Sequence, residues 1–290
     1  MSRRFLVLGA NGMLGNSCMR VLSENGGTAW GTVRSTSASS RFPEHVRERL
    51  IAGVEADDLD TVVNAMARSR PDVVVNCIGV VKQLPSSKDP LVSLPLNSLF
   101  PHRLARLCAL ADARLIHIST DCVFSGEKGG YTEADPPDAD DLYGVSKHLG
   151  EVDYPHAITL RTSIIGHELT GARSLVDWYL SQDDQVQGFT KAVFSRVPTV
   201  ELARVIRDFV APRPHLQGLY HVSADPISKY DLLRLIGATY GRQTRVVASD
   251  RLNIDRSLDS SRFRSATNWQ PAAWADLIQR MYVEFQEISR

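Results

Sequence analysis

Residues 9–15 read Gly9-Ala10-Asn11-Gly12-Met13-Leu14-Gly15, and this glycine-spaced stretch indicates the architecture of the first half of the chain. It follows an apolar run, Phe5–Leu8, and opens a helical pattern, Met13–Asn25. Glycines in this context permit a tight turn, close approach of backbone to a pyrophosphate, and tight packing of helix on sheet. The amide groups and partial positive charge of the helix N-terminus favour an anion. We expect a dinucleotide to contact Gly9, Asn11, Gly12, Met13, Leu14 and Gly15; a turn without a ligand is the alternative.

Short apolar runs alternate with helical patterns along the first 160 or so residues. The apolar runs are Phe5–Leu8, Thr28–Val33, Val73–Cys77, Leu115–Ile118 and Ala157–Arg161. The helical patterns are Met13–Asn25, Leu59–Arg70, Ser98–Ala111 and Leu142–Val152. Runs that are apolar at nearly every position suit strands buried on both faces. This order predicts an α/β fold with a doubly wound, Rossmann-type parallel sheet, in an NAD(P)-binding domain of residues 1–162.

The pattern changes after residue 162, where helices dominate. Helical patterns cover Ser174–Ser181, Thr199–Val210, Lys229–Tyr240 and Trp274–Ile288. We expect residues 163–290 to form a smaller, mainly helical C-terminal lobe that binds the substrate. The run Gly218–Val222 is suited to return as a sheet strand, so the lobe should interleave with the sheet around residues 197–223.

Composition argues against several classes of function. The 290 residues include 33 Lys plus Arg and 33 Asp plus Glu, which leaves no net positive charge to neutralise nucleic-acid phosphates. The apolar runs are far shorter than the roughly 20 residues of a membrane helix. Four widely separated cysteines, with no C-x-x-C pair, indicate neither a zinc site nor a disulfide framework. We expect a cytoplasmic protein that binds no nucleic acid, membrane or metal.

Arg34 follows the second apolar run, at the position where a dinucleotide fold meets the adenosine ribose. A guanidinium can hold a 2′-phosphate in forked geometry, whereas an NAD-specific site usually has an acidic residue there. The position favours NADPH over NADH, with a solvated loop arginine as the alternative. Asp57 and Asp58 precede the next helical pattern, and they are expected either to cap that helix or to contact the adenine amino group.

Tyr143 and Lys147 lie one helical turn apart in the segment YGVSK at 143–147. Residues at i and i+4 share one helix face, so the ammonium should lower the pKa of the phenol from about 10 toward the working pH. Such a phenol is suited to general acid or base catalysis. Thr120, in STDCVFSG at 119–126, follows the run Leu115–Ile118, which places its hydroxyl at the carboxyl end of a strand, where ligands bind in open α/β sheets.

Together these motifs resemble the extended short-chain dehydrogenase/reductase family, and within it the dTDP-4-dehydrorhamnose reductase branch of nucleotide-sugar reductases. The resemblance extends over nearly the whole chain. It rests on GANGMLG at 9–15, NCIG at 76–79, Asn97, STDCVFSG at 119–126, YGVSK at 143–147, LRTSIIG at 160–166 and RSLDSSRF at 256–263. The ordered combination is specific, although each piece alone is not.

The resemblance implies roles for the matching residues. Thr120 would hydrogen-bond the substrate oxygen, Tyr143 would transfer the proton, and Lys147 would bind the nicotinamide ribose and tune Tyr143. Hydride would pass from NADPH, or alternatively from NADH, to the C4 ketone of a nucleotide-linked 4-keto-6-deoxy sugar. Further cofactor contacts would come from Cys77, Ile78, Gly79 and Asn97, and for Asn97 a purely structural role is the alternative.

A nucleotide-sugar substrate carries a diphosphate, so the second lobe should supply cations and an apolar or stacking surface. The candidate substrate residues are Phe189, Lys191, Arg196 and Arg256 from that lobe, and Lys82, Asp121, Cys122 and Val123 from the sheet domain. The alternative for each of these arginines and lysines is that it is a solvated surface charge without a ligand. Cys122 occupies a position that is often aromatic in this branch, which leaves the sugar and the nucleotide open.

The expected function is therefore NADPH-dependent reduction of such a sugar, for deoxysugar or cell-surface polysaccharide synthesis. One alternative is an epimerase or dehydratase of the same fold. Dehydratases of this family generally place an acidic pair just after the catalytic Thr, and here only Asp121 is acidic. The other alternative is a non-catalytic, NADP-binding regulatory subunit, which the presence of Thr120, Tyr143 and Lys147 disfavours. A homodimer is compatible with each of these functions.

Overall fold

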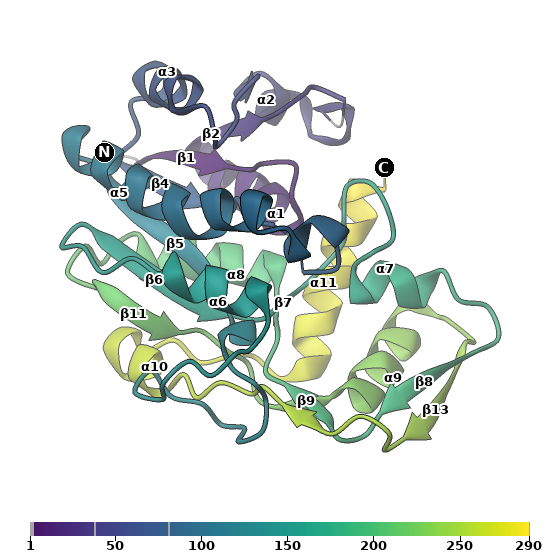
Figure 1. The fold of residues 1–290 in the computed structure, drawn as a ribbon. Helices are drawn as coiled ribbons and strands as arrows, with labels where there is room; N and C mark the ends of the chain where they lie inside the picture. The colour runs from purple at the N-terminus through teal and green to yellow at the C-terminus, as the bar shows by residue number, and fades with distance from the viewer. Residues whose placement is uncertain (1–2, 38, 81, 290) are drawn as a thin grey trace.

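A seven-stranded parallel sheet forms the centre of the molecule (Figure 1). The computed structural model describes residues 3–37, 39–80 and 82–289. The strands are β1 (Arg4–Leu8), β2 (Thr28–Val33), β3 (Leu50–Ala52), β4 (Val73–Asn76), β5 (Arg114–Thr120), β6 (Ala157–Thr162) and β11 (Gly218–His221). Their order across the sheet is β11-β6-β5-β4-β1-β2-β3. The predicted doubly wound α/β fold is confirmed, with the reversal of strand order between β1 and β4.

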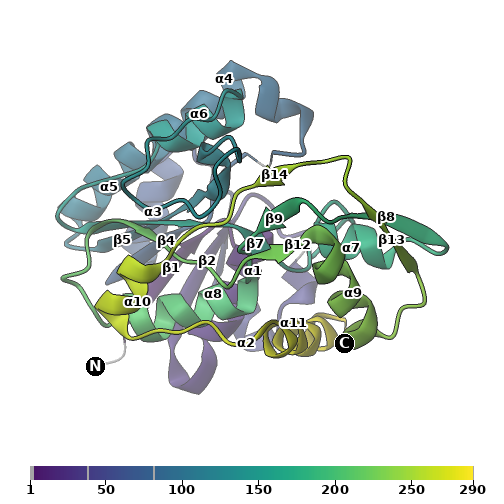
Figure 2. The same ribbon diagram turned by 90° about the horizontal axis from the view of Figure 1, so that it is seen from below.

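Helices cover both faces of this sheet, as Figure 2 shows from below. They are α1 (Met13–Leu22), α3 (Leu59–Ser69), α5 (Phe100–Leu110), α6 (Leu142–Leu149) and α8 (Thr199–Val205). Successive residues of β1 point to opposite faces: Val7 joins a buried cluster with α1 and α8, and Leu6 joins a cluster with α3 and α5. This two-sided burial explains why the strand is apolar at every position after its first.

β11 joins the sheet late in the chain, beside β6 and parallel to it. The chain reaches it through α8 and a π-helical stretch, Ile206–Val210. Leu202 and Ile206 are fully buried in the cluster that includes Val7 of β1. Within residues 199–221, α8 therefore packs on the sheet and β11 forms its edge strand. The chain passes through part of the second lobe before it returns to the sheet in this way.

The second lobe has a small core of its own. Its helices are α7 (Leu175–Leu180), α9 (Lys229–Tyr240) and α11 (Trp274–Ile288). Tyr179, Leu233 and Met281, one from each helix, are buried together. Short strands complete the lobe: β7 (Ile164–Ile165), β8 (Gln185–Phe189), β9 (Ala192–Phe194), β10 (Val197–Pro198), β12 (Ile227–Ser228), β13 (Arg245–Ser249) and β14 (Ile254–Asp255). The sequence analysis predicted the helices but none of these strands.

The remaining helices are α2 (Glu44–Arg47), α4 (Pro90–Ser93) and α10 (Ser261–Thr267). Among the described helices, none combines the length and the apolar character needed to cross a membrane. All four cysteines are free thiols, with Cys18 and Cys108 buried.

Candidate active site

A cavity of about 530 Å³ opens at the carboxyl edge of the central sheet. The segments that follow β1, β4, β5 and β6 form its walls together with α6. Its lining residues include Asn11, Gly12, Met13, Leu14, Cys77, Ile78, Gly79, Lys82, Thr120, Asp121, Cys122, Tyr143, Lys147, Arg196 and Arg256. The glycine turn, the Thr120 hydroxyl and the YGVSK segment, which are far apart in sequence, thus meet where ligands bind in open α/β sheets.

The glycine turn forms one end of this cavity. The amide of Gly12 donates to the carbonyl of Gly9 at 3.0 Å, and Gly12 precedes α1, whose first turn has no acidic side chain. A Cβ atom on Gly15 would lie 2.1 Å from the Gly9 oxygen, so a side chain there would push α1 away from the turn. The Oδ1 atom of Asn11 is buried without a hydrogen-bond partner among the described residues. The turn offers helix amides to an anion and one free acceptor to a hydroxyl.

Residues 77–79 continue the cavity wall after β4. Asn97, which the sequence analysis assigned to the cofactor site, is 1% exposed and does not line the cavity. Its Oδ1 atom accepts a hydrogen bond from the Val80 amide at 2.9 Å, and its Nδ2 atom donates to Ser146 Oγ at 3.0 Å. Asn97 therefore connects the loop after β4 to α6. This arrangement fits the purely structural role that the sequence analysis gave as the alternative.

Thr120 and Tyr143 meet in the cavity. Thr120 ends β5, and its hydroxyl accepts a hydrogen bond from the Cys122 amide at 3.1 Å. Tyr143 lies in the first turn of α6 and lines the same cavity as Thr120. The close approach of α6 depends on Gly144, because a Cβ atom there would lie 2.3 Å from the Cys122 carbonyl oxygen. This packing places two hydroxyl groups where one substrate oxygen could contact both.

Lys147 is buried one helical turn beyond Tyr143. Its Nζ atom donates to the carbonyl of Ile118 at 2.8 Å. A Cβ atom on Gly79 would lie 3.8 Å from the same Nζ atom, so the ammonium also borders the wall after β4. Burial lowers the pKa of Lys147 from 10.5 to about 8, and the amine therefore remains mostly protonated at pH 7.

The pKa of Tyr143 departs from the sequence prediction. Lys147 was expected to lower it, but burial of the phenol raises the pKa above its ordinary value of 10, and Cys122 acts in the same direction. The side chain of Thr120 lowers the pKa of Tyr143 and opposes only part of this effect. The predicted lowering is wrong for the chain alone, because desolvation of the phenolate is the largest effect and Asp121 and Asp141 also raise the pKa of Tyr143. A protonated phenol is the form that donates a proton to a developing alkoxide.

Two arginines, Arg196 and Arg256, also line the cavity. Arg256 Nη1 lies 3.6 Å from Cys122 Sγ, and Arg196 Nη1 donates to the carbonyl of Ile164 at 3.4 Å. The Nε atoms of both arginines are buried and have no hydrogen-bond partner among the described residues. Because a buried N–H group without a partner is costly, these groups favour an anionic ligand such as a phosphate.

A second cavity of about 360 Å³ adjoins the first and extends into the second lobe. Both cavities are lined by Met13, Gln83, Ile164, Glu168, Phe194 and Arg196. In the second, Lys229 Nζ lies 4.8 Å from the centre of the Trp178 ring and 5.1 Å from that of Phe189. The sequence analysis named Phe189 as an apolar or stacking residue, and the structure adds Trp178 and Lys229 beside it.

The other candidate substrate residues have different surroundings. Lys82 lines the first cavity, where its Nζ atom pairs with Asp141 Oδ2 at 2.5 Å and lies 5.7 Å from the centre of the Tyr143 ring. Lys191 is exposed and lines neither cavity. Val123 also lines neither cavity, because it is fully buried in a separate apolar cluster.

Arg34, Asp57 and Asp58 are exposed and do not line the cavities. Arg34 directly follows β2, at the same sheet edge as the turn, and the next residue's carbonyl lies 3.5 Å from Asn11 Nδ2. Asp58 Oδ1 accepts a hydrogen bond from the Asp60 amide at 3.1 Å and caps α3. Two roles were considered for Asp58, a helix cap and a contact with adenine, and in the structure Asp58 caps α3.

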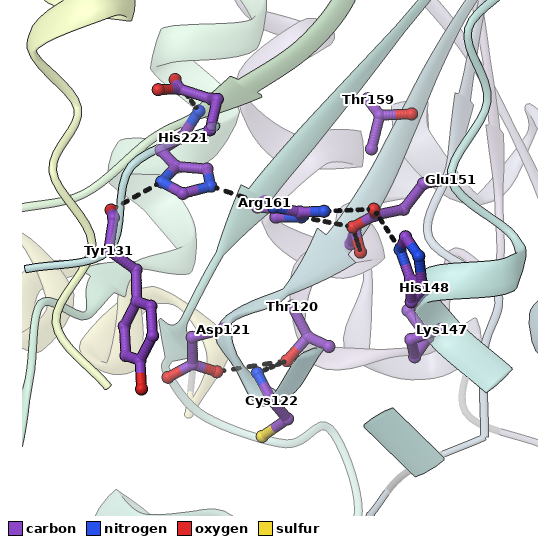
Figure 3. A network of polar contacts seen from close by, with 12 residues as sticks. Thr120, Asp121, Cys122, Tyr131, Lys147, His148, Glu151, Thr159, Arg161 and His221 are labelled. Carbon is purple, nitrogen blue, oxygen red and sulfur yellow. Dashed lines mark hydrogen bonds and ion pairs between the residues drawn. The ribbon is translucent and has the colours of Figure 1, made fainter. Parts of the chain in front are cut away.

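The sequence analysis missed the residues that line the cavity after β6, and it missed the polar groups behind Thr120. The missed lining residues include Thr162, Ser163, Ile164 and Glu168. Their signal was present in LRTSIIG at 160–166, since this motif follows a predicted strand to its carboxyl end. Figure 3 shows the groups behind the cavity, where Arg161 pairs with Glu151 through Nε and Nη2, both at 2.6 Å.

These residues suit a nicotinamide dinucleotide. The helix amides at Gly12, the buried acceptor of Asn11 and residues 77–79 form one wall that leads from the turn to Lys147. They would hold the phosphates and the ribose groups along that wall. No group of three or more His, Cys, Asp or Glu side chains suited to a metal ion occurs within residues 3–37, 39–80 and 82–289.

The sheet, the glycine turn and the Thr-Tyr-Lys arrangement define the extended short-chain dehydrogenase/reductase class. Within that class, the chain belongs to the family described as the RmlD substrate binding domain, which matches residues 3–286. The resemblance inferred from the sequence motifs is thereby confirmed.

Individual relatives carry reductase names. The probable low-salt glycan biosynthesis reductase Agl14 of Haloferax volcanii is 32% identical over 195 residues, which make up 63% of each chain. The chain thus matches less than two thirds of that relative's length. A probable dTDP-4,6-dihydroxy-2-methyloxan-3-one 4-ketoreductase of Streptomyces antibioticus is 30% identical over 261 residues, 82% of this chain and 79% of that protein. The crystal structure of dTDP-4-dehydrorhamnose reductase (rfbD) from Bacillus anthracis, in complex with NADP, has the same fold, with a TM-score of 0.79, 19% identity, and coverage of 98% of this chain and 99% of that one.

Proposed function

We propose that this chain is an NAD(P)-dependent reductase that reduces the C4 ketone of a nucleotide-linked 4-keto-6-deoxy sugar, with NADPH as its preferred donor. The observation that carries the proposal is that the glycine turn, Thr120, Tyr143 and Lys147 line one cavity. The names of the two relatives, a glycan biosynthesis reductase and a sugar 4-ketoreductase, support the reaction type. The product would serve deoxysugar or cell-surface polysaccharide synthesis.

The proposed mechanism assigns a task to each of three side chains. The bound dinucleotide would supply hydride to the carbonyl carbon. Thr120 and Tyr143 would hold the carbonyl oxygen, and the protonated phenol of Tyr143 would donate its proton as negative charge develops on that oxygen. The Lys147 ammonium would then stabilise the phenolate that remains.

The substrate end would bind the nucleoside diphosphate. Arg196 and Arg256 carry buried Nε atoms without a partner in the described parts of the chain, and they would hold the phosphate oxygens. Trp178 and Phe189 in the adjoining cavity would provide the stacking surface for the base. The sugar would then extend toward Thr120, between the two ends of the site.

The test is oxidation of NADPH and NADH by the purified protein against dTDP-, UDP-, GDP- and CDP-linked 4-keto-6-deoxyhexoses, with the products identified by NMR. We expect one member of the panel to be reduced at C4, faster with NADPH. The parent nucleotide hexoses, which carry hydroxyl groups at C4 and C6, test the alternatives: inversion at C4 or loss of water without net consumption of NADPH would instead indicate an epimerase or dehydratase. NADPH binding without turnover of any member would indicate a regulatory protein.

A further inference from the structure

A buried polar network lies behind the cavity, and the proposed mechanism does not use it (Figure 3). Its centre is Glu151, just past the end of α6, with a side chain only 9% exposed. The carboxylate accepts hydrogen bonds from Ser119 Oγ at 2.7 Å and from Arg161 Nε and Nη2, each at 2.6 Å. His148 Nδ1 lies 3.1 Å from it on the exposed side. One carboxylate thus connects β5, β6 and the end of α6.

This network borders the end of β5 that carries Thr120 and the acceptor of the Lys147 ammonium. Ser119, which donates to Glu151, lies between Ile118 and Thr120 in β5. The carbonyl of Ile118 accepts the hydrogen bond from Lys147 Nζ. The carboxylate that holds Ser119 therefore fixes the strand end that carries Thr120 and the acceptor of Lys147. If Glu151 only stabilised the fold through an ion pair, it would need Arg161 as its partner but not Ser119. The hydrogen bond from Ser119 therefore indicates a second role for Glu151.

We propose that Glu151 is a positioning residue for Thr120 and Lys147: through Ser119 it fixes the carboxyl end of β5, and its negative charge acts on the buried ammonium of Lys147. The inference deepens the proposed function and rests on it for the effect on turnover. The effect on Lys147 itself is independent of any reaction.

The charged and titratable groups near Lys147 identify Glu151 as the carboxylate that opposes burial. They are Cys77 after β4, His117 in β5, Tyr143 in α6, and Glu151, whose partner Arg161 lies in β6. Burial lowers the pKa of Lys147, Glu151 is the main group that raises it, and Cys77 contributes less. His117 stays neutral, because burial and then the Lys147 charge hold its pKa well below 6.5. Removing the charge of Glu151 should therefore lower the pKa of Lys147 further.

The test is a pH titration of Lys147 in the ligand-free chain. NMR of the Lys147 Cε and Nζ signals, in protein labelled with isotopic lysine, reports the protonation of the amine. The signals are assigned from their loss in Lys147→Arg. We expect a midpoint near pH 8 in the unmodified chain. Glu151→Gln keeps the size and an acceptor but removes the charge, and should lower the midpoint by about one pH unit, as expected for the loss of a nearby opposite charge.

Matched variants separate this role from simple support of the fold. Glu151→Gln leaves Arg161 without its counterion, so the double variant Glu151→Gln/Arg161→Gln removes both charges. It should lower the midpoint less than Glu151→Gln does, because the loss of the Arg161 cation raises the pKa of Lys147. His148→Gln touches the same carboxylate from the exposed side and should leave the titration unchanged. A wild-type midpoint in folded Glu151→Gln would overturn the electrostatic part of the proposal.

Ser119→Ala tests the positioning part, because it breaks the tie between Glu151 and β5 without changing any charge. We expect it to lower kcat/KM about tenfold while the midpoint of Lys147 stays in place, since small misplacements of catalytic groups are costly. Unchanged kcat/KM in Ser119→Ala would overturn that part. A wild-type chain that reduces no sugar would refute the proposed function, whereas the titration would still decide whether Glu151 acts on Lys147.

Discussion

Tyr143 is the residue whose removal tests the chemistry most directly, because one hydroxyl group can be deleted while the ring remains. We expect Tyr143→Phe to lower kcat by about 10²- to 10⁴-fold, the usual contribution of a positioned proton donor. NADPH affinity, measured by fluorescence titration, should stay near the wild-type value, because the glycine turn is untouched. Tyr154→Phe is the control, since the Tyr154 hydroxyl contacts His102 instead. A fully active Tyr143→Phe enzyme would remove Tyr143 from the mechanism.

The titration of Lys147 should determine how the reaction rate changes at basic pH. Its pKa of about 8 means that the amine is charged below that pH and neutral above it. If the charged form stabilises the phenolate, kcat/KM falls as the pH rises through about 8. The measurement is kcat/KM for the best sugar between pH 6 and 10, with NADPH saturating. A rate that increases from pH 7 to 9 would mean that the neutral amine or the ionised phenol is the active form.

Arg34 predicts which dinucleotide is preferred. It is exposed at the end of β2, free to reach a 2′-phosphate beside the glycine turn. Arg34→Asp should weaken NADPH binding by about 10- to 100-fold, the worth of charge-assisted hydrogen bonds, and should affect NADH far less. Arg47→Asp makes the same charge change at an exposed position in α2 and serves as the control. Equal losses for both dinucleotides in Arg34→Asp would refute contact with the 2′-phosphate.

At the scale of elements, the position of α6 depends on one close contact. Gly144→Ala would place a Cβ atom 2.3 Å from the Cys122 carbonyl oxygen, so α6 must move away from the end of β5. We expect kcat/KM to fall at least about tenfold, because α6 carries both Tyr143 and Lys147. Stability should decrease by about 1–3 kcal/mol, the usual cost of overpacking, measured by urea unfolding. Val145→Ala changes the same helix on its exposed side and should preserve activity.

The elements that sequence predicted well are those with long, one-sided or fully apolar patterns. β1, β2 and α3 lie within a residue or two of their predicted bounds. β3 (Leu50–Ala52) was missed because three residues give too short a pattern to distinguish from a loop. β8 alternates exposed and buried residues, so its signal existed, but the surrounding helical patterns obscured it. Short strands of this kind depend on their partners more than on their own sequence.

At the scale of the whole molecule, sequence located the cofactor side of the site better than the substrate side. The turn at 9–15 and YGVSK at 143–147 belong to regular elements, whose geometry fixes where side chains point. Lys191 lies in the turn before β9 and Arg196 in the connection after it, yet only Arg196 lines the cavity. Which loop side chain turns inward depends on packing between the lobes, and no local pattern encodes it. The same holds for Glu151 and Arg161, which pair across two elements.

The interleaving of the chain predicts that residues 1–162 do not fold alone. The face of the sheet that carries Val7 is covered by α8, and Leu202, Val205 and Ile206 are fully buried there. Burying three such side chains contributes about 4–9 kcal/mol, comparable to the entire stability of about 5–15 kcal/mol of a typical protein. The fragment 1–162 also lacks β11, so β6 would become an exposed edge. We expect it to show no cooperative thermal unfolding by circular dichroism, whereas the full chain unfolds cooperatively and is stabilised by NADPH. A fragment that unfolds cooperatively and binds NADPH would show instead that the first 162 residues form an independent domain.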